Sequence, residues 1–203
     1  MRNKITLAMA VAGMMCGTSA FAAGDAISTT DAGHGTIQFT GSVIDAPCSI
    51  VPESQNIQVN LGQVNLKTLN QQGKTSSSVP FSINLTGCSF ATPAPPSTTV
   101  QYSKVAVTFP GTSSPSVEAA KKGEITNGAA DAAGNVVIQL LYGDGTTPVD
   151  VSKVNPAAGD TDNIELDSTS ATSKLQFYAR MMATDVATAG NVGATVTYKL
   201  HYF

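Results

Sequence analysis

The stretch LQFYARMMA, residues 175–183, alternates between two faces along its whole length. Its odd-numbered residues are all apolar, whereas Gln176 and Arg180 lie on the even-numbered face. Successive side chains of a β-strand point to opposite faces, so this pattern predicts a strand with one buried and one wetter face. The same alternation recurs in five further runs: residues 36–43, 81–86, 105–109, 138–142 and 194–202.

Turn-rich stretches separate these runs, notably residues 92–96, 110–111 and 143–145, which are rich in Pro and Gly. Short strands between regular turn signals favour an all-β fold, a single antiparallel β-sandwich. We expect surface loops at residues 90–99 and 160–173. A short helical turn at residues 119–122 is the single helical element that the sequence suggests.

The first twenty-two residues have the pattern of a secretory signal peptide. Arg2 and Lys4 precede an apolar stretch at residues 5–15, and small residues then lead to a cleavage site between Ala22 and Ala23. The apolar stretch is far shorter than the ~20 residues that a membrane-spanning helix needs. A lipoprotein anchor on Cys16 is the other alternative, and the bulky Met15 disfavours it.

Signal removal changes the cysteine count and the charge of the chain. The mature chain has 203 − 22 = 181 residues and a net charge of 9 − 14 = −5, and it retains two of three cysteines, Cys48 and Cys88. Two cysteines in an exported chain predict one disulfide bond, worth roughly 4 kcal/mol for a loop of this length. A free thiol pair is the alternative, but the spacing does not match a redox motif.

The composition argues against nucleic-acid binding, metal binding and catalysis. Only 12% of residues are charged, the net charge is −3, and the chain has two histidines. There is no basic excess, no nucleophile motif, and no phosphate-binding loop. The acidic stretch at residues 160–165 superficially resembles a calcium loop, but Ile164 stands where a ligand is needed. We therefore expect no enzyme activity, no cofactor and no metal.

Residues 33–50, GHGTIQFTGSVIDAPCSI, closely resemble the start of mature pilins of the chaperone–usher pathway. Residues 81–88 resemble the strand leading into that family's second cysteine, and residues 177–180 its aromatic–Arg motif. The alternating C-terminal strand with penultimate Tyr202 is similar too, although relatives often end on a polar residue rather than Phe203. The likeness is to P-pilus, mannose-resistant Proteus-like and type 1 major subunits. It implies an incomplete immunoglobulin-like sandwich, completed by a donated strand.

The resemblance divides the mature chain into a donor extension, residues 23–44, and a pilin domain, residues 45–203. It implies donor side chains at Ile37, Phe39 and Val43, with Gly41 at a shallow site that admits no side chain. The implied acceptor groove and chaperone contact comprise Val196, Tyr198, Leu200, Tyr202 and the carboxylate of Phe203. Periodicity alone leaves open that Phe39 and Val43 belong to the first strand of their own domain.

The resemblance further implies a structural subunit of an extracellular surface fimbria, exported through the periplasm, most simply the major shaft subunit. Its partners would be identical or related subunits, a periplasmic chaperone and an outer-membrane usher, with no nucleic acid and no membrane-spanning segment in the mature chain. A minor adaptor and a tip-associated adhesin are the alternatives within the same system. A tip adhesin usually carries a separate lectin domain, for which the mature chain has no room.

Overall fold

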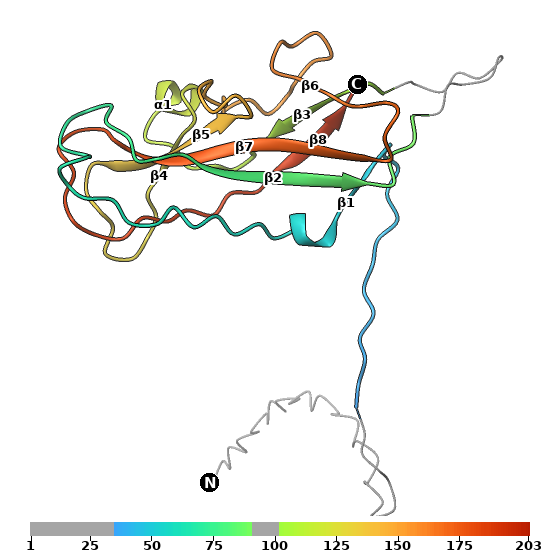
Figure 1. Ribbon diagram of the computed structural model, residues 1–203, viewed down its shortest axis with the longest axis horizontal. Helices are drawn as coiled ribbons and strands as arrows, with labels where there is room; N and C mark the ends of the chain where they lie inside the picture. Colours follow the sequence, from blue (N-terminus) through green and yellow to red (C-terminus); the bar gives the residue numbers. More distant parts are fainter. Residues whose placement is uncertain (1–34, 91–101) are drawn as a thin grey trace, which may run out of the picture. The chain divides into compact units, whose positions relative to one another are not determined.

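The computed structural model describes residues 35–90 and 102–203, whose strands form two antiparallel sheets (Figure 1). The larger sheet has the strand order β1 (Ser49–Ile50), β2 (Val79–Thr86), β7 (Thr172–Ala183), β5 (Val136–Tyr142) and β4 (Glu124–Thr126). The smaller sheet has the order β6 (Ile164–Glu165), β3 (Lys104–Thr108) and β8 (Lys199–Tyr202). A sandwich of two antiparallel sheets confirms the predicted fold class.

Strand β7 is the centre of the larger sheet, as the alternation of residues 175–183 predicts. It pairs with β2 on one side, where Phe177 lies opposite Phe81, and with β5 on the other, where Ala179 lies opposite Leu140. Its odd-numbered side chains from residue 175 onward are buried, and its even-numbered ones are half-buried or exposed. Because both neighbours are present, the long strand has both of its edges hydrogen-bonded.

The core lies between the two sheets, and Phe177 is at its centre. The Phe177 ring stacks on Phe81 at a centroid distance of 5.7 Å and meets Phe109 edge-on at 6.1 Å. Tyr142 approaches the same ring at 6.0 Å. The predicted runs at residues 81–86, 105–109 and 138–142 thus supply β2, β3 and β5, and their apolar faces form this core.

Two short helical elements complete the domain. The 3-10 helix η1 (Pro52–Ser54) follows β1, and α1 (Val117–Lys121) lies where the sequence suggests a helical turn. The Ser116 hydroxyl caps α1 by accepting a hydrogen bond from the Ala119 N–H at 3.1 Å. No helix in the described part of the chain is long and apolar enough to cross a membrane.

Three sequence expectations need correction. The C-terminal run is predicted as a strand over residues 194–202, but only β8 pairs, because β3 ends at Thr108, opposite Lys199, and leaves residues 194–198 without a neighbour. Residues 36–43 form no strand. The predicted loop at residues 160–173 contains β6 and the start of β7. The signal peptide, with Ala22 and Ala23, and most of the loop predicted at residues 90–99 lie outside the described residues.

Candidate functional site

A groove runs along one side of the domain between two stretches of chain that belong to neither sheet. One wall is residues 55–66, which follow η1, and the other is residues 188–198, which lead into β8. Figure 1 shows both stretches on the same side of the sandwich, the first in teal and the second in red. Within the described residues no backbone hydrogen bond joins these two walls to each other.

The groove opens directly onto the hydrophobic core. A cavity of about 600 Å³ lies between residues 55–61 and residues 194–196. Its floor is made of core side chains from the larger sheet and from Phe109, which directly follows β3: Phe81, Phe109, Ile125, Ile138, Leu140 and Ala179. A core exposed in this way is what a sandwich lacking one strand presents to solvent.

A second cavity, of about 590 Å³, continues the groove along the same walls. It shares Val59 and Leu61 with the first cavity and lies between residues 59–69 and residues 187–192. Its floor is a separate apolar cluster that includes Leu69, Val136 and Met181. The groove therefore has two apolar compartments in series, each with its own set of core residues.

Hydrogen bonds join the walls just beyond the two ends of the groove. At one end the Tyr198 hydroxyl donates to the Ser54 carbonyl at 2.7 Å. At the other end the Ala187 N–H donates to the Leu69 carbonyl at 3.0 Å. Burial raises the pKa of Tyr198 further above the physiological range, in which a tyrosine hydroxyl is protonated and can donate. The walls are therefore fixed at both ends and open between them.

The edge of β8 that faces away from β3 is unpaired among the described strands. β8 pairs with β3 from Tyr202 opposite Val105 to Lys199 opposite Thr108. A free strand edge is a template for pairing with another chain. The unpaired edge of β8, which follows the second wall in the chain, therefore offers backbone groups with which an added strand can pair.

The implied acceptor residues take different positions in this arrangement. Val196 lines the first cavity, while Tyr198 fixes the end of the groove. Leu200 and Tyr202 pack against the core within β8. At the C-terminus, a Phe203 oxygen accepts hydrogen bonds from the N–H groups of Ser103 and Lys104, at 2.7 and 3.0 Å.

Residues 35–45 carry the implied donor side chains, all of them solvent-exposed. Ile37 is 78% exposed, Phe39 is 88% exposed and Val43 is fully exposed. A Cβ added at Gly41 would meet no atom within 4 Å. Because these residues pair with no strand, the interpretation of Phe39 and Val43 as the first strand of their own domain finds no support in the structure.

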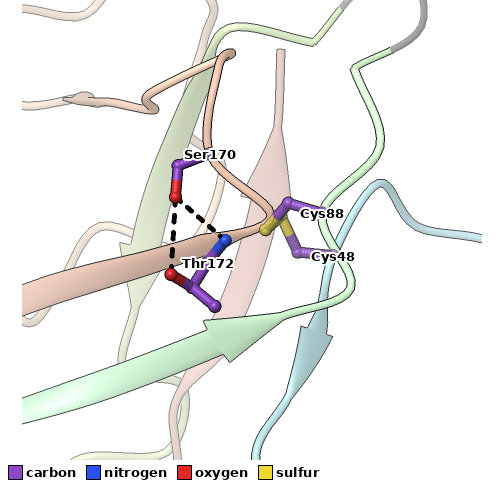
Figure 2. Close-up of a disulfide and its surroundings, with 4 residues drawn as sticks. All are labelled: Cys48, Cys88, Ser170 and Thr172. Atoms are coloured by element: carbon purple, nitrogen blue, oxygen red, sulfur yellow. Dashed lines mark hydrogen bonds between the residues drawn. A yellow bond between two sulfur atoms is a disulfide. The ribbon is translucent and has the colours of Figure 1, made fainter.

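The predicted disulfide joins Cys48 to Cys88, just after the exposed segment (Figure 2). It links the residue before β1 to the loop after β2, and Cys48 is only 2% exposed. The Cys88 N–H also donates to the Ala171 carbonyl at 3.0 Å, between the labelled Ser170 and Thr172 at the start of β7. The bond anchors the point at which the exposed segment leaves the domain.

The acidic stretch at residues 160–165 is occupied by a lysine of the same chain. Lys153 Nζ contacts Asp160 and Asp162 at 2.8 and 2.6 Å, and the Tyr142 hydroxyl donates to Asp162 at 3.0 Å. The hydrogen bond from Lys153 lowers the pKa of Asp160. The two carboxylates therefore close a surface loop, and no cluster of possible metal ligands occurs among the described residues.

The sequence matches the model of the fimbrial protein family over residues 37–202. The chain belongs to this family. It is 36% identical to the type-1 fimbrial protein A chain of Escherichia coli, with 97% of both chains covered. It is 35% identical to the F17 fimbrial protein of Escherichia coli, over 86% of this chain and 91% of that one. A solved structure of a chaperone–usher pilus, from work on the uncoiling of its rod, has the same fold. Its TM-score against this chain is 0.61 at 20% identity, and the match covers 87% of this chain and 100% of that one.

Family membership confirms the resemblance deduced from the sequence motifs. The chain is a structural subunit of extracellular surface fimbriae and not an enzyme, and it has the incomplete immunoglobulin-like fold seen in the chaperone–usher pilus structure. Subunits of such pili assemble with related subunits.

Sequence reasoning missed the first wall of the groove. Residues 57–61 carry a period-two signal of their own, because Ile57, Val59 and Leu61 alternate with Gln58 and Asn60. All three apolar side chains line a cavity of the groove and are half-buried. The alternation at residues 57–61 was therefore the available signal for this wall.

Proposed function

We propose that the groove is an acceptor site for a strand donated by a second subunit, and that this exchange polymerises the chain into a fimbrial shaft. The donated strand is residues 36–43 of the incoming subunit, within an N-terminal extension over residues 23–44. The observation that carries the proposal is the open groove whose two walls share no backbone hydrogen bond, found in a chain that also presents an exposed alternating apolar segment.

The donor segment has the periodicity that such a groove selects. In an extended strand every second side chain points the same way, at intervals of about 6.6 Å. Ile37, Phe39 and Val43 would then point together into the two apolar cavities. Full burial of each of these side chains contributes roughly 1.5–3 kcal/mol, and the backbone supplies hydrogen bonds to both walls.

Gly41 stands on the same face as these three side chains but carries none. A glycine in a strand marks a place where another backbone comes close. Its role in the donor would be to let the strand approach the walls where no cavity receives a side chain.

The open groove also explains a need for a chaperone and an usher. Before assembly the subunit exposes core residues and a free strand edge, a combination that promotes aggregation. A periplasmic chaperone would cover the groove with a strand of its own, contacting Val196, Tyr198, Leu200 and Tyr202, and would bind the terminal carboxylate of Phe203. An outer-membrane usher would then exchange this strand for the donor of the next subunit.

The complete donor segment and the low charge of the chain favour the major shaft subunit over a minor adaptor or tip-associated adhesin. Immunogold electron microscopy of surface fibres separates these roles. Label along the whole shaft supports the major subunit, whereas label confined to the tip contradicts it.

The test of strand exchange compares two neighbouring substitutions in the donor segment. Phe39→Asp places a charge on the face that enters the groove, whereas Thr40→Asp places the same charge on the opposite face. Fibres from cells expressing Thr40→Asp should give the wild-type ladder of heat-sensitive, detergent-resistant polymers. Phe39→Asp should abolish the ladder while its monomer still accumulates, and equal ladders from both variants would refute the proposal.

A further inference from the structure

The groove wall at residues 191–193 is attached to one loop, residues 127–133, which connects β4 to β5. The Gly128 N–H donates to the Gly193 carbonyl at 2.9 Å. The Asn191 N–H donates to the Asp131 carbonyl, and the Asn191 carbonyl accepts from the Ala133 N–H, both at 2.8 Å. This attachment lies where the two cavities meet, because Val192 lines the second and Ala194 the first.

The side chain of Asn127 forms hydrogen bonds both with the groove wall and with the loop to which the wall is attached. Its Nδ2 donates to the Asn191 carbonyl at 2.8 Å and to the Ala133 carbonyl at 3.2 Å. Its Oδ1 accepts from the Gly193 N–H at 3.0 Å and from the Ala129 N–H at 3.3 Å. An asparagine amide has two donor hydrogens and two acceptor lone pairs, so Asn127 uses its whole hydrogen-bonding capacity here.

The neighbouring backbone is packed tightly against the same loop. A Cβ added at Gly190 would lie 2.4 Å from the Ala133 nitrogen, a contact that requires the backbone to move. Glycine at position 190 therefore permits the close approach on which the Asn127 hydrogen bonds depend.

We propose that Asn127 is a positioning residue that fixes the second wall of the groove before a donor strand arrives, and so raises the affinity for that strand. The inference rests on the donor-strand exchange proposed above. Residues 194–198 have no strand neighbour, so residues 191–198 are held by this attachment and by the Tyr198 bridge, while the Thr188 N–H donates to the Gly134 carbonyl at 3.1 Å at the start of the wall. A wall that is already ordered loses less conformational entropy when a strand binds.

The decisive substitution is Asn127→Asp, which keeps the side-chain shape and replaces the donor nitrogen with an oxygen. That oxygen would face the carbonyls of Asn191 and Ala133 and repel both. Asn163→Asp is the matched control, because Asn163 Nδ2 also donates to two carbonyls, those of Ala157 and Ala158, at 2.8 and 3.1 Å. Asn163 lies in the loop closed by Lys153 and lines neither cavity.

The assay refolds the mature chain, residues 23–203, from guanidinium with an excess of a fluorescent peptide of residues 35–45. Size-exclusion chromatography then gives the bound peptide per folded chain as a function of peptide concentration. We expect the concentration for half-maximal capture to rise about tenfold in Asn127→Asp, equivalent to about 1.4 kcal/mol, and less than twofold in Asn163→Asp. Hydrogen exchange at Gly193 and Ala133 should accelerate in Asn127→Asp, while exchange in the β2–β7 ladder stays unchanged.

Four results would overturn the inference. Unchanged capture by Asn127→Asp despite faster exchange at Gly193 shows that wall order does not control strand binding. An equal loss in Asn163→Asp shows a general loss of stability. If Asn127→Asp does not fold, Asn127→Ser removes the same hydrogen bonds without adding charge, and wild-type capture by that variant counts against the inference. Absence of capture by the wild-type chain rejects strand exchange itself, and the inference with it.

Discussion

Replacement of both Cys48 and Cys88 by alanine should lower the free energy of unfolding of the subunit by about 4 kcal/mol. The disulfide spans a sequence separation of 40 residues. In the chain-entropy model, the loss of a cross-link around a loop of that size stabilises the unfolded chain by about 4 kcal/mol. Alanine is preferred to serine because Cys48 is buried, and a buried hydroxyl would add a desolvation penalty of its own.

A loss of this size is large beside the 5–15 kcal/mol by which ordinary domains are stable. This loss of unfolding free energy should have its largest effect in a subunit with an open groove, because the core of such a subunit is already incomplete. The bond also holds the base of the donor segment next to the end of β2. The double variant should therefore yield less folded subunit as well as less stable subunit.

The assay is urea unfolding of the mature chain refolded with the peptide of residues 35–45. We expect a lower midpoint and a higher m value, since the uncrosslinked chain exposes more surface when it unfolds. Wild-type protein reduced with dithiothreitol is the control, because it keeps both sulfur atoms but lacks the bond. A loss under about 1 kcal/mol in both samples would refute the assignment of the bond as a main source of stability.

Two further perturbations follow from the tyrosines of the C-terminal region. Tyr198→Phe removes the hydrogen bond to the Ser54 carbonyl. The free energy of unfolding of the peptide-bound subunit in urea should fall by about 0.5–1.5 kcal/mol. If the variant is as stable as the wild-type protein, the groove is closed at that end without the bond. Burial raises the pKa of Tyr202 to about 12. The unfolded chain then loses its proton first, so stability should fall between pH 10 and pH 12. Alkaline unfolding that is equally steep in Tyr202→Phe would contradict this cause.

Much of the sandwich could be predicted from the sequence because its strands are locally encoded. The alternation in residues 175–183 gives both the existence of β7 and the face that it buries, since a strand repeats every two residues. The same holds for β2, β3 and β5, and for the disulfide, where only two cysteines remain in the mature chain.

Strand pairing is not encoded locally. The incorrect strand predictions concern the segments in which the presence of a partner decides whether a strand forms. Residues 194–198 alternate as regularly as residues 199–202, yet only the latter form a strand, because β3 ends opposite Lys199. Residues 36–43 have a strand pattern with no partner in their own chain. In both cases the sequence specifies the tendency to be extended, and the presence of a neighbour specifies whether a ladder forms.

The sequence by itself determined the all-β class, the cysteine pair and the membership in a family of fimbrial subunits, and it predicts an export signal. Only the tertiary structure decided where the groove lies, which core residues form its floor, and that Asn127 joins its second wall to the β4–β5 loop. These features join residues far apart in the sequence, such as Asn127 with Asn191, 64 positions apart, and Ser54 with Tyr198, 144 positions apart. Local periodicity carries no information about such contacts, because they depend on how the two sheets pack and not on the order of residues within a strand.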